Sequence, residues 1–142
     1  MPTTVIPPSG ECLITAADIQ PGMKISRLYT LGQLLTSGSS GVPRGVNYGL
    51  TANEIVCNMR NLALQCLDPI KAKYPNMYMS SVWRSEAVNR SCGGSTSSDH
   101  LTGSAADIQF TGFSRKDYYN AIIEIQKILP VYRQLILEYK AG

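Results

Sequence analysis

The chain has 142 residues, with 13 Lys and Arg against 10 Asp and Glu, one His and four Cys. This length indicates a single domain, and the content of 44% hydrophobic and 16% charged residues is typical of a folded globular protein and excludes a disordered one. The chain lacks the basic stripe of a nucleic-acid binder, an apolar run of the roughly 20 residues that a membrane span needs, and a secretory signal.

Residues 1–26 are rich in Pro, Gly and Thr and are predicted to form an extended arm rather than a core element. The arm would lie either on its own domain or against a neighbouring subunit. Residues 27–142 are predicted to form the one domain. Within it, residues 28–35 predict a short helix, and residues 36–49 predict a plain loop that lacks the G-K-[ST] ending of a phosphate-binding loop.

The clearest helix is predicted to begin at Thr51, since Thr51-Ala52-Asn53-Glu54 reads as a capping box. Apolar residues then recur in steps of three and four, which places them on one face of the helix. Pro69 is predicted to end or bend this helix, with one further turn as the alternative. Residues 74–76 are predicted to form a turn.

The second half of the chain alternates between strands and helices. Strands are predicted at residues 77–82, 105–110 and 133–139, and helices at residues 85–89 and from Ser114 to Pro130, with a loop of small residues at 92–99. Ser114-Arg115-Lys116-Asp117 resembles an N-cap for the last helix. This order predicts an α+β domain in which helices cover a small, mostly antiparallel sheet.

The four cysteines, Cys12, Cys57, Cys66 and Cys92, show no C-x-x-C spacing, so a cysteine zinc site has no support. A chain of this length does not need disulfides to fold. Because Cys57 and Cys66 fall in an apolar helical stretch, we predict reduced, buried thiols that pack as small hydrophobic residues.

The single histidine, His100, lies on a loop that leads into the strand carrying Asp107. If Gly103 lets the chain turn back sharply, the imidazole and the carboxylate can approach one point. Such a pair of donors suits Zn²⁺. The alternative is a surface histidine and an unrelated aspartate at the end of a strand.

The pattern S-x-H-x-x-G-x-A-x-D is complete from Ser98 through Asp107, and upstream the chain reads S-V-W-R-S, then A-V-N and G-G-S, in residues 81–95. Together these motifs resemble the zinc D-Ala-D-Ala carboxypeptidases of peptidase family M15, in the subfamily A branch that is common in bacteriophages. The resemblance covers about residues 28–139. It implies the hedgehog and D-Ala-D-Ala peptidase type of fold.

The resemblance also implies roles for four residues. His100 and Asp107 would be two of three zinc ligands, Arg84 would stabilise the oxyanion formed during peptide cleavage, and Ser98 would bind substrate or orient His100. The implied protein is a phage cell-wall hydrolase that cleaves peptidoglycan cross-links or stem peptides. It would act in the virion or at the host cell wall or periplasm, with other virion proteins or a second copy as further partners.

The chain departs from the family pattern because it has no second histidine. The family's third ligand is a histidine in a W-x-H-type stretch after the last strand, with an acidic base just before it. Sequence beyond Gly142 would supply both, or Glu138, Cys92 or a partner chain would supply a ligand. Otherwise the fold serves as a catalytically inactive virion or tail component. Two smaller departures are Trp83 in place of Tyr, and Asp99 where Gln or Asn is common.

Overall fold

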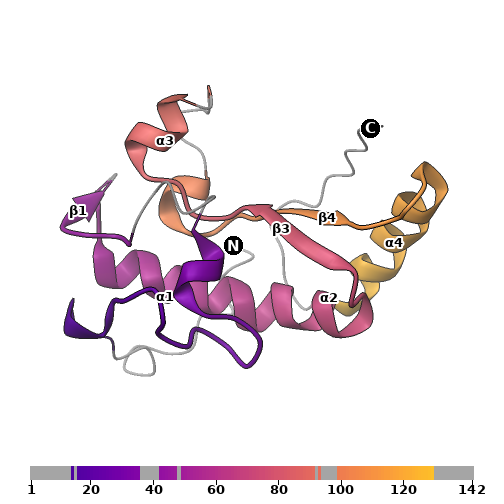
Figure 1. The fold of residues 1–142 in the computed structure, drawn as a ribbon, viewed down its shortest axis with the longest axis horizontal. Helices are drawn as coiled ribbons and strands as arrows, with labels where there is room; N and C mark the ends of the chain where they lie inside the picture. The colour runs from indigo at the N-terminus through magenta and orange to yellow at the C-terminus, as the bar shows by residue number, and fades with distance from the viewer. Residues whose placement is uncertain are drawn as a thin grey trace.

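The computed structural model describes residues 14, 16–35, 42–47, 49–91, 93 and 99–129. Its longest element is a helical segment against which other parts of the fold pack (Figure 1). It consists of α1 (Ala52–Leu62), a π-helical turn (Ala63–Leu67) and α2 (Asp68–Lys73). The predicted capping box at its start is confirmed, since the Thr51 side chain accepts a hydrogen bond from the Glu54 backbone N–H and the Glu54 carboxylate accepts one from Thr51.

The helix continues past Pro69, as in the predicted alternative of one further turn. In the π-helical turn the Asp68 backbone N–H bonds to the carbonyl of Ala63, five residues back. This wider turn leaves Pro69 in the first turn of α2, where its missing N–H is tolerated best. Met77 then follows the predicted turn, with its N–H bonded to the carbonyl of Tyr74.

Within the described residues, the sheet that positions the site consists of two antiparallel strands, β3 (Met77–Ser81) and β4 (Asp107–Phe110). In its register Met77 pairs with Phe110 and Ser81 with Asp107, with a bulge between Met79 and Ser81. A separate and shorter antiparallel pair is a hairpin of β1 (Val46–Asn47) and β2 (Leu50–Thr51). The prediction of a plain loop over residues 36–49 is therefore wrong at its C-terminal end; residues 36–41 and 48 lie outside the described part.

Shorter helical elements complete the fold. The 3-10 helices are η2 (Ala16–Asp18), η3 (Leu31–Leu34) and η6 (Asp99–Thr102), and the remaining α-helices are α3 (Glu86–Ser91) and α4 (Arg115–Ile128). The predicted α+β class is confirmed, and the N-cap at Ser114 is present as a capping box with Asp117. The strand predicted at residues 133–139 lies outside the described residues. No helix in the described ranges has both the length and the apolar character to span a membrane.

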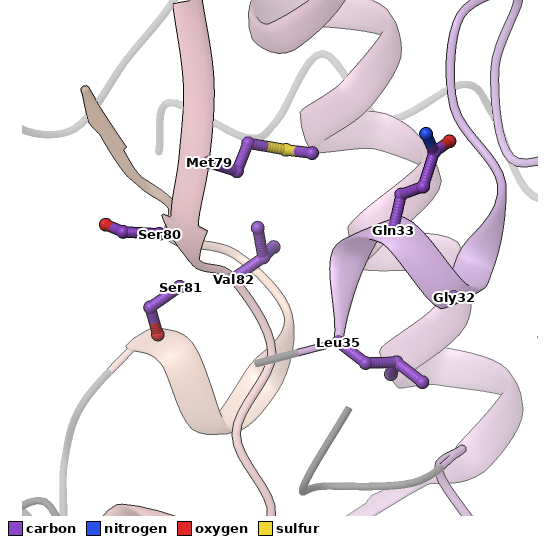
Figure 2. A pocket seen from close by; sticks show the side chains of 7 residues that line it. All are labelled: Gly32, Gln33, Leu35, Met79, Ser80, Ser81 and Val82. Carbon is purple, nitrogen blue, oxygen red and sulfur yellow. The ribbon is translucent and has the colours of Figure 1, made fainter. Parts of the chain in front are cut away.

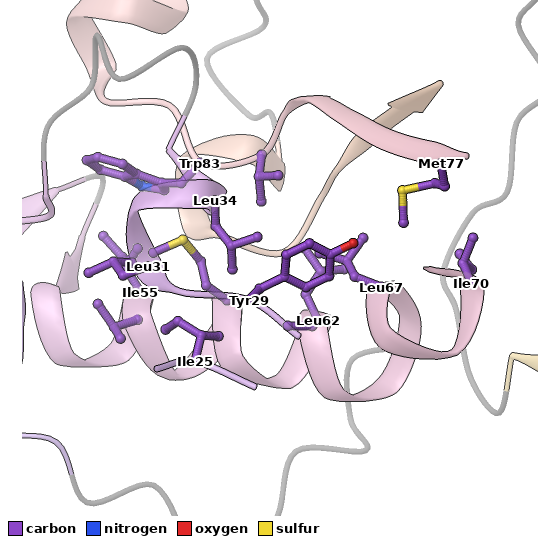
Figure 3. Packing of buried hydrophobic residues seen from close by; sticks show 14 of the residues in the cluster. Ile25, Tyr29, Leu31, Leu34, Ile55, Leu62, Leu67, Ile70, Met77 and Trp83 are labelled. Carbon is purple, nitrogen blue, oxygen red and sulfur yellow. The ribbon is translucent and has the colours of Figure 1, made fainter. Parts of the chain in front are cut away.

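The core lies between the long helical segment, residues 19–34 and β3 (Figure 3). Ile19 and Ile25 belong to it, so residues 16–26 contribute to the core, unlike the prediction, and this part of the predicted arm lies on its own domain, as one of the two alternatives has it. Their apolar side chains pack against residues that follow much later in the chain, which composition alone does not reveal. Buried members of the cluster that Figure 3 labels are Ile25, Tyr29, Leu31, Leu34, Ile55, Leu62, Leu67, Ile70, Met77 and Trp83.

The prediction of reduced, buried cysteines is wrong for Cys57, which is half-buried and disulfide-bonded. Its neighbours Ile55 and Val56 face the core, whereas Cys57 lies at the margin of the buried face of α1. Cys66 is a free thiol as predicted, half-buried at the margin of the core, and burial raises its pKa. Cys12 and Cys92 lie outside the described residues.

Candidate active site

The structure brings three of the four predicted site residues together. Arg84 follows β3, His100 lies on η6, and Asp107 begins β4. The fourth residue, Ser98, lies outside the described residues. The three polar groups therefore meet where the two strands of the sheet end.

The imidazole of His100 is anchored through Nδ1, and its Nε2 faces Asp107. Its Nδ1 lies within hydrogen-bond distance of the backbone carbonyl of Val82. Because a carbonyl only accepts hydrogen bonds, Nδ1 carries the hydrogen, and in the neutral ring Nε2 carries the lone pair. Nε2 faces Oδ1 of Asp107 at 3.5 Å. The His100 side chain is 11% exposed and that of Asp107 is 51% exposed, so the pair is anchored in the protein and open on one side.

A glycine makes the turn between His100 and Asp107. Gly103 has a φ of +79°, in the left-handed region, and a Cβ there would lie 2.7 Å from the Met59 side chain and 2.8 Å from the Ile55 carbonyl. The chain thus passes directly against α1, which only glycine permits. Asn58 secures the same turn by donating a 2.9 Å hydrogen bond to the carbonyl of Thr102.

Arg84 is fixed by contacts in three directions. Its Nε donates to Ser81 Oγ at 3.1 Å, one terminal nitrogen donates to Asn89 Oδ1 at 3.3 Å, and the other lies 3.3 Å from Oδ2 of Asp107. Its backbone N–H also bonds to the carbonyl of His100 at 3.2 Å. The guanidinium and the imidazole therefore face the same aspartate, and the backbones of Arg84 and His100 are bonded to each other.

The bulge in β3 lies directly beside Asp107. Met79 pairs with Ile108 and Ser81 with Asp107, so Ser80 is the extra residue. The Ser80 hydroxyl donates to the carbonyl of Asp107 at 3.2 Å. Bulges bend a strand and redirect the side chains around them. Here the bulge falls where the carboxylate must turn towards His100 and Arg84.

The donor geometry fits part of a zinc site. Two donors of one tetrahedral zinc ion, each about 2.0–2.2 Å from the metal, lie about 3.4 Å apart. His100 Nε2 and Asp107 Oδ1 are 3.5 Å apart. A second-sphere carbonyl on the other ring nitrogen, as Val82 provides, is usual for a histidine that binds a metal. Across the described ranges, however, no three His, Cys, Asp or Glu side chains form one group.

A cavity of about 320 Å³ adjoins this site, between η3 and β3 (Figure 2). It is lined by Gly32, Gln33 and Leu35 on one side and by residues 79–82 on the other. Two of these lining residues also contact the site, because Ser81 accepts from Arg84 and the carbonyl of Val82 faces His100. Ser81 and Val82 therefore belong both to the lining of the cavity and to the surroundings of Arg84 and His100.

The sequence did not identify every residue that shapes the site. Asn89 and Ser81 hold Arg84, although their positions in the S-V-W-R-S and A-V-N motifs were noted without a role. Trp83 does not take part, since its side chain is 1% exposed in the core and its backbone N–H bonds to Leu34 (Figure 3). One sequence signal could have indicated Asn89: it lies in the short helix predicted directly after Arg84, five residues further along the chain.

Comparison with known proteins gives one match. A family model described as Peptidase M15 matches residues 39–129, which is more than half of the chain. The matched range includes Arg84, His100 and Asp107. No curated protein and no solved structure matches the chain.

Proposed function

Because the chain belongs to the M15 peptidase family, we propose that it is a zinc metallopeptidase that cleaves peptide bonds in peptidoglycan cross-links or stem peptides. The observation that carries the proposal is the contact of Asp107 with both His100 and Arg84, at 3.5 and 3.3 Å. A metal-binding pair beside a fixed cation suits the hydrolysis of a peptide bond by a metallopeptidase.

His100 Nε2 and Asp107 Oδ1 are the two atoms that would hold the zinc ion. The hydrogen bond from Nδ1 to Val82 supports this role, because it presents the lone pair of Nε2 to the ligand side. Bound zinc supplies Lewis acidity, which polarises a carbonyl and activates water at neutral pH. The third protein ligand that such a site needs has to come from outside the described residues.

Arg84 would stabilise the negative charge that develops on the carbonyl oxygen of the scissile bond. A guanidinium has five N–H groups, and three of those of Arg84 bond to Ser81, Asn89 and Asp107. Within the described part of the chain this leaves two N–H groups for a ligand. The side chain is 15% exposed, so these donors act in a partly desolvated site, where they are stronger than in water.

The substrate class is the finer part of the proposal. The complete motif from Ser98 to Asp107 resembles the subfamily A enzymes of bacteriophages, which supports a role as a phage cell-wall hydrolase acting at the host wall. Ser98 would then contact the substrate peptide. The cavity beside β3 is large enough for a few side-chain or backbone groups of such a peptide.

The test is zinc analysis together with cleavage of synthetic stem peptides, using the longest natural form of the protein. We expect zinc in the wild type, loss of zinc in His100→Ala, and retained zinc with about 10²–10³-fold lower kcat in Arg84→Ala. Asn76→Ala is a matched control, because Asn76 bonds to the carbonyl of Thr111, at the opposite end of the β3–β4 pair.

One set of results would reject the enzyme. The peptidase proposal fails if the protein binds no zinc and cleaves no stem peptide, and if His100→Ala changes neither result. If that protein still binds peptidoglycan or assembles into a particle in the presence of a chelator, the alternative of a catalytically inactive virion or tail component holds instead.

A further inference from the structure

We propose that Asn89 and Ser81 are positioning residues that hold the guanidinium of Arg84 in the orientation needed for catalysis. This inference rests on the proposed peptidase function. It goes beyond that function by assigning a task to two residues through their hydrogen bonds to Arg84.

The first observation is the geometry of the three contacts. Ser81 Oγ binds Nε and Asn89 Oδ1 binds one terminal nitrogen, so two different N–H groups of the planar guanidinium are fixed from the protein side. Two bonds to one rigid plane set its tilt as well as its position. The remaining terminal nitrogen then reaches Asp107 with a single contact.

That single contact matters for the neighbouring histidine. An arginine and a carboxylate left to themselves favour a two-bond fork in which both carboxylate oxygens accept. Such a fork would draw Oδ1 of Asp107 away from His100 Nε2. Because Ser81 and Asn89 hold the guanidinium back, Arg84 uses Oδ2 and Oδ1 faces the imidazole.

The local sequence explains how Asn89 reaches Arg84. Ser85 precedes α3 and caps it: its hydroxyl accepts from the N–H of Val88, and its carbonyl accepts from the N–H of Asn89. This N-cap fixes the first turn of α3 and turns Asn89 inwards, where it is 2% exposed. A polar side chain that is so deeply buried needs hydrogen-bond partners, and Oδ1 of Asn89 accepts one hydrogen bond from Arg84.

The experiment compares Asn89→Ala, Ser81→Ala and the conservative Ser81→Thr in the full chain. We expect kcat to fall about 10- to 100-fold in both alanine variants, with KM nearly unchanged and zinc retained. Ser81→Thr keeps the hydroxyl and should restore most of the rate. Asn76→Ala serves again as a matched control for the loss of one asparagine hydrogen bond.

Two further measurements separate positioning from a general structural role. In the Arg84→Ala background, Asn89→Ala should lower kcat no further, since its effect acts through the guanidinium. Independently of zinc and substrate, the side-chain NMR signal of Arg84 Nε–H should exchange slowly with water in the wild type and in Ser81→Thr. It should broaden or exchange rapidly in both alanine variants.

The inference is overturned if Asn89→Ala and Ser81→Ala leave the Arg84 signal and kcat unchanged, or if the Asn89→Ala effect multiplies fully with that of Arg84→Ala. Failure of the proposed function looks different. There, wild type and Arg84→Ala are equally inactive, and the NMR signal alone decides whether Ser81 and Asn89 hold the guanidinium.

Discussion

The Nε2 atom of His100 lies 3.5 Å from Oδ1 of Asp107, a residue on a different element of the fold. The turn at Gly103 and the bond from Nδ1 to Val82 hold this relationship from two sides. A histidine and an aspartate that merely formed an ion pair on the surface would need neither the glycine turn nor the hydrogen bond to Val82. The pair is therefore built into the fold rather than formed by chance on its surface.

If this pair binds zinc, the metal will stabilise the folded state. We expect zinc at about 100 times its dissociation constant to add about 2.7 kcal/mol to the free energy of unfolding of metal-free protein. Differential scanning calorimetry with and without zinc measures the shift in Tm. In His100→Ala and Asp107→Asn the shift should largely disappear; an equal shift in these variants would place the metal elsewhere.

Gly103→Ala tests the close passage of the chain against α1. The positive φ costs an alanine about 1–2 kcal/mol, and the clash with Met59 and Ile55 adds about 1–3 kcal/mol. Gly112 has the same φ of +79° but nothing within 4 Å of its added Cβ, so Gly112→Ala isolates the backbone effect. Urea unfolding should show a clearly larger loss for Gly103→Ala. Equal losses would mean that the loop moves aside freely.

The two capping boxes predict a dependence of stability on acid pH. The hydrogen bond from the Thr51 backbone to Glu54 and that from Ser114 to Asp117 lower the pKa values of both carboxyl groups below their ordinary values of 4.5 and 3.8. The stabilisation is therefore complete above the ordinary values and is lost as the pH falls through the lowered ones.

Asp117→Asn checks the sign of this effect. The variant should be less stable than the wild type in urea unfolding at pH 7, because it lacks the carboxylate that accepts from Ser114. Near pH 2 the two proteins should differ less, since the wild-type carboxyl is then largely protonated. A difference that stays constant between these pH values would contradict the lowered pKa.

Cys66 is predicted to react slowly in the folded protein. Burial raises the pKa of its thiol, which reduces the fraction of reactive thiolate at neutral pH. Without reductant, a thiol reagent should modify Cys66 slowly in buffer and rapidly in denaturant, as followed by mass spectrometry. Cys66→Ala removes this reaction, and Cys57 should be modified only after reduction of its disulfide. Equal rates in buffer and denaturant would show that the thiol is accessible.

Local signals in the sequence predicted the elements that depend on neighbouring residues. Both capping boxes, at Thr51 and Ser114, formed where their side chains and spacing place them. The strand from Met77 also formed as predicted. These features need only residues within one turn or one strand, so their physical causes are legible in a short stretch of sequence.

The parts that the sequence did not predict depend on distant contacts. Ile19 and Ile25 are buried because later elements of the chain cover them. For the site, the motif brought Arg84, His100 and Asp107 into one prediction. The role of Asn89 became visible only once α3 was placed against the guanidinium.

The backbone bond between Trp83 and Leu34 ties the segment before the family-matched range to the strand exit that carries Arg84. Leu31 and Leu34 are both completely buried there. A fragment trimmed to residues 39–129 would therefore lack Leu31 and Leu34 and would expose apolar core surface around Trp83, close to Arg84. The hydrophobic core therefore extends back to Ile19, ahead of the start of the family-matched range at residue 39.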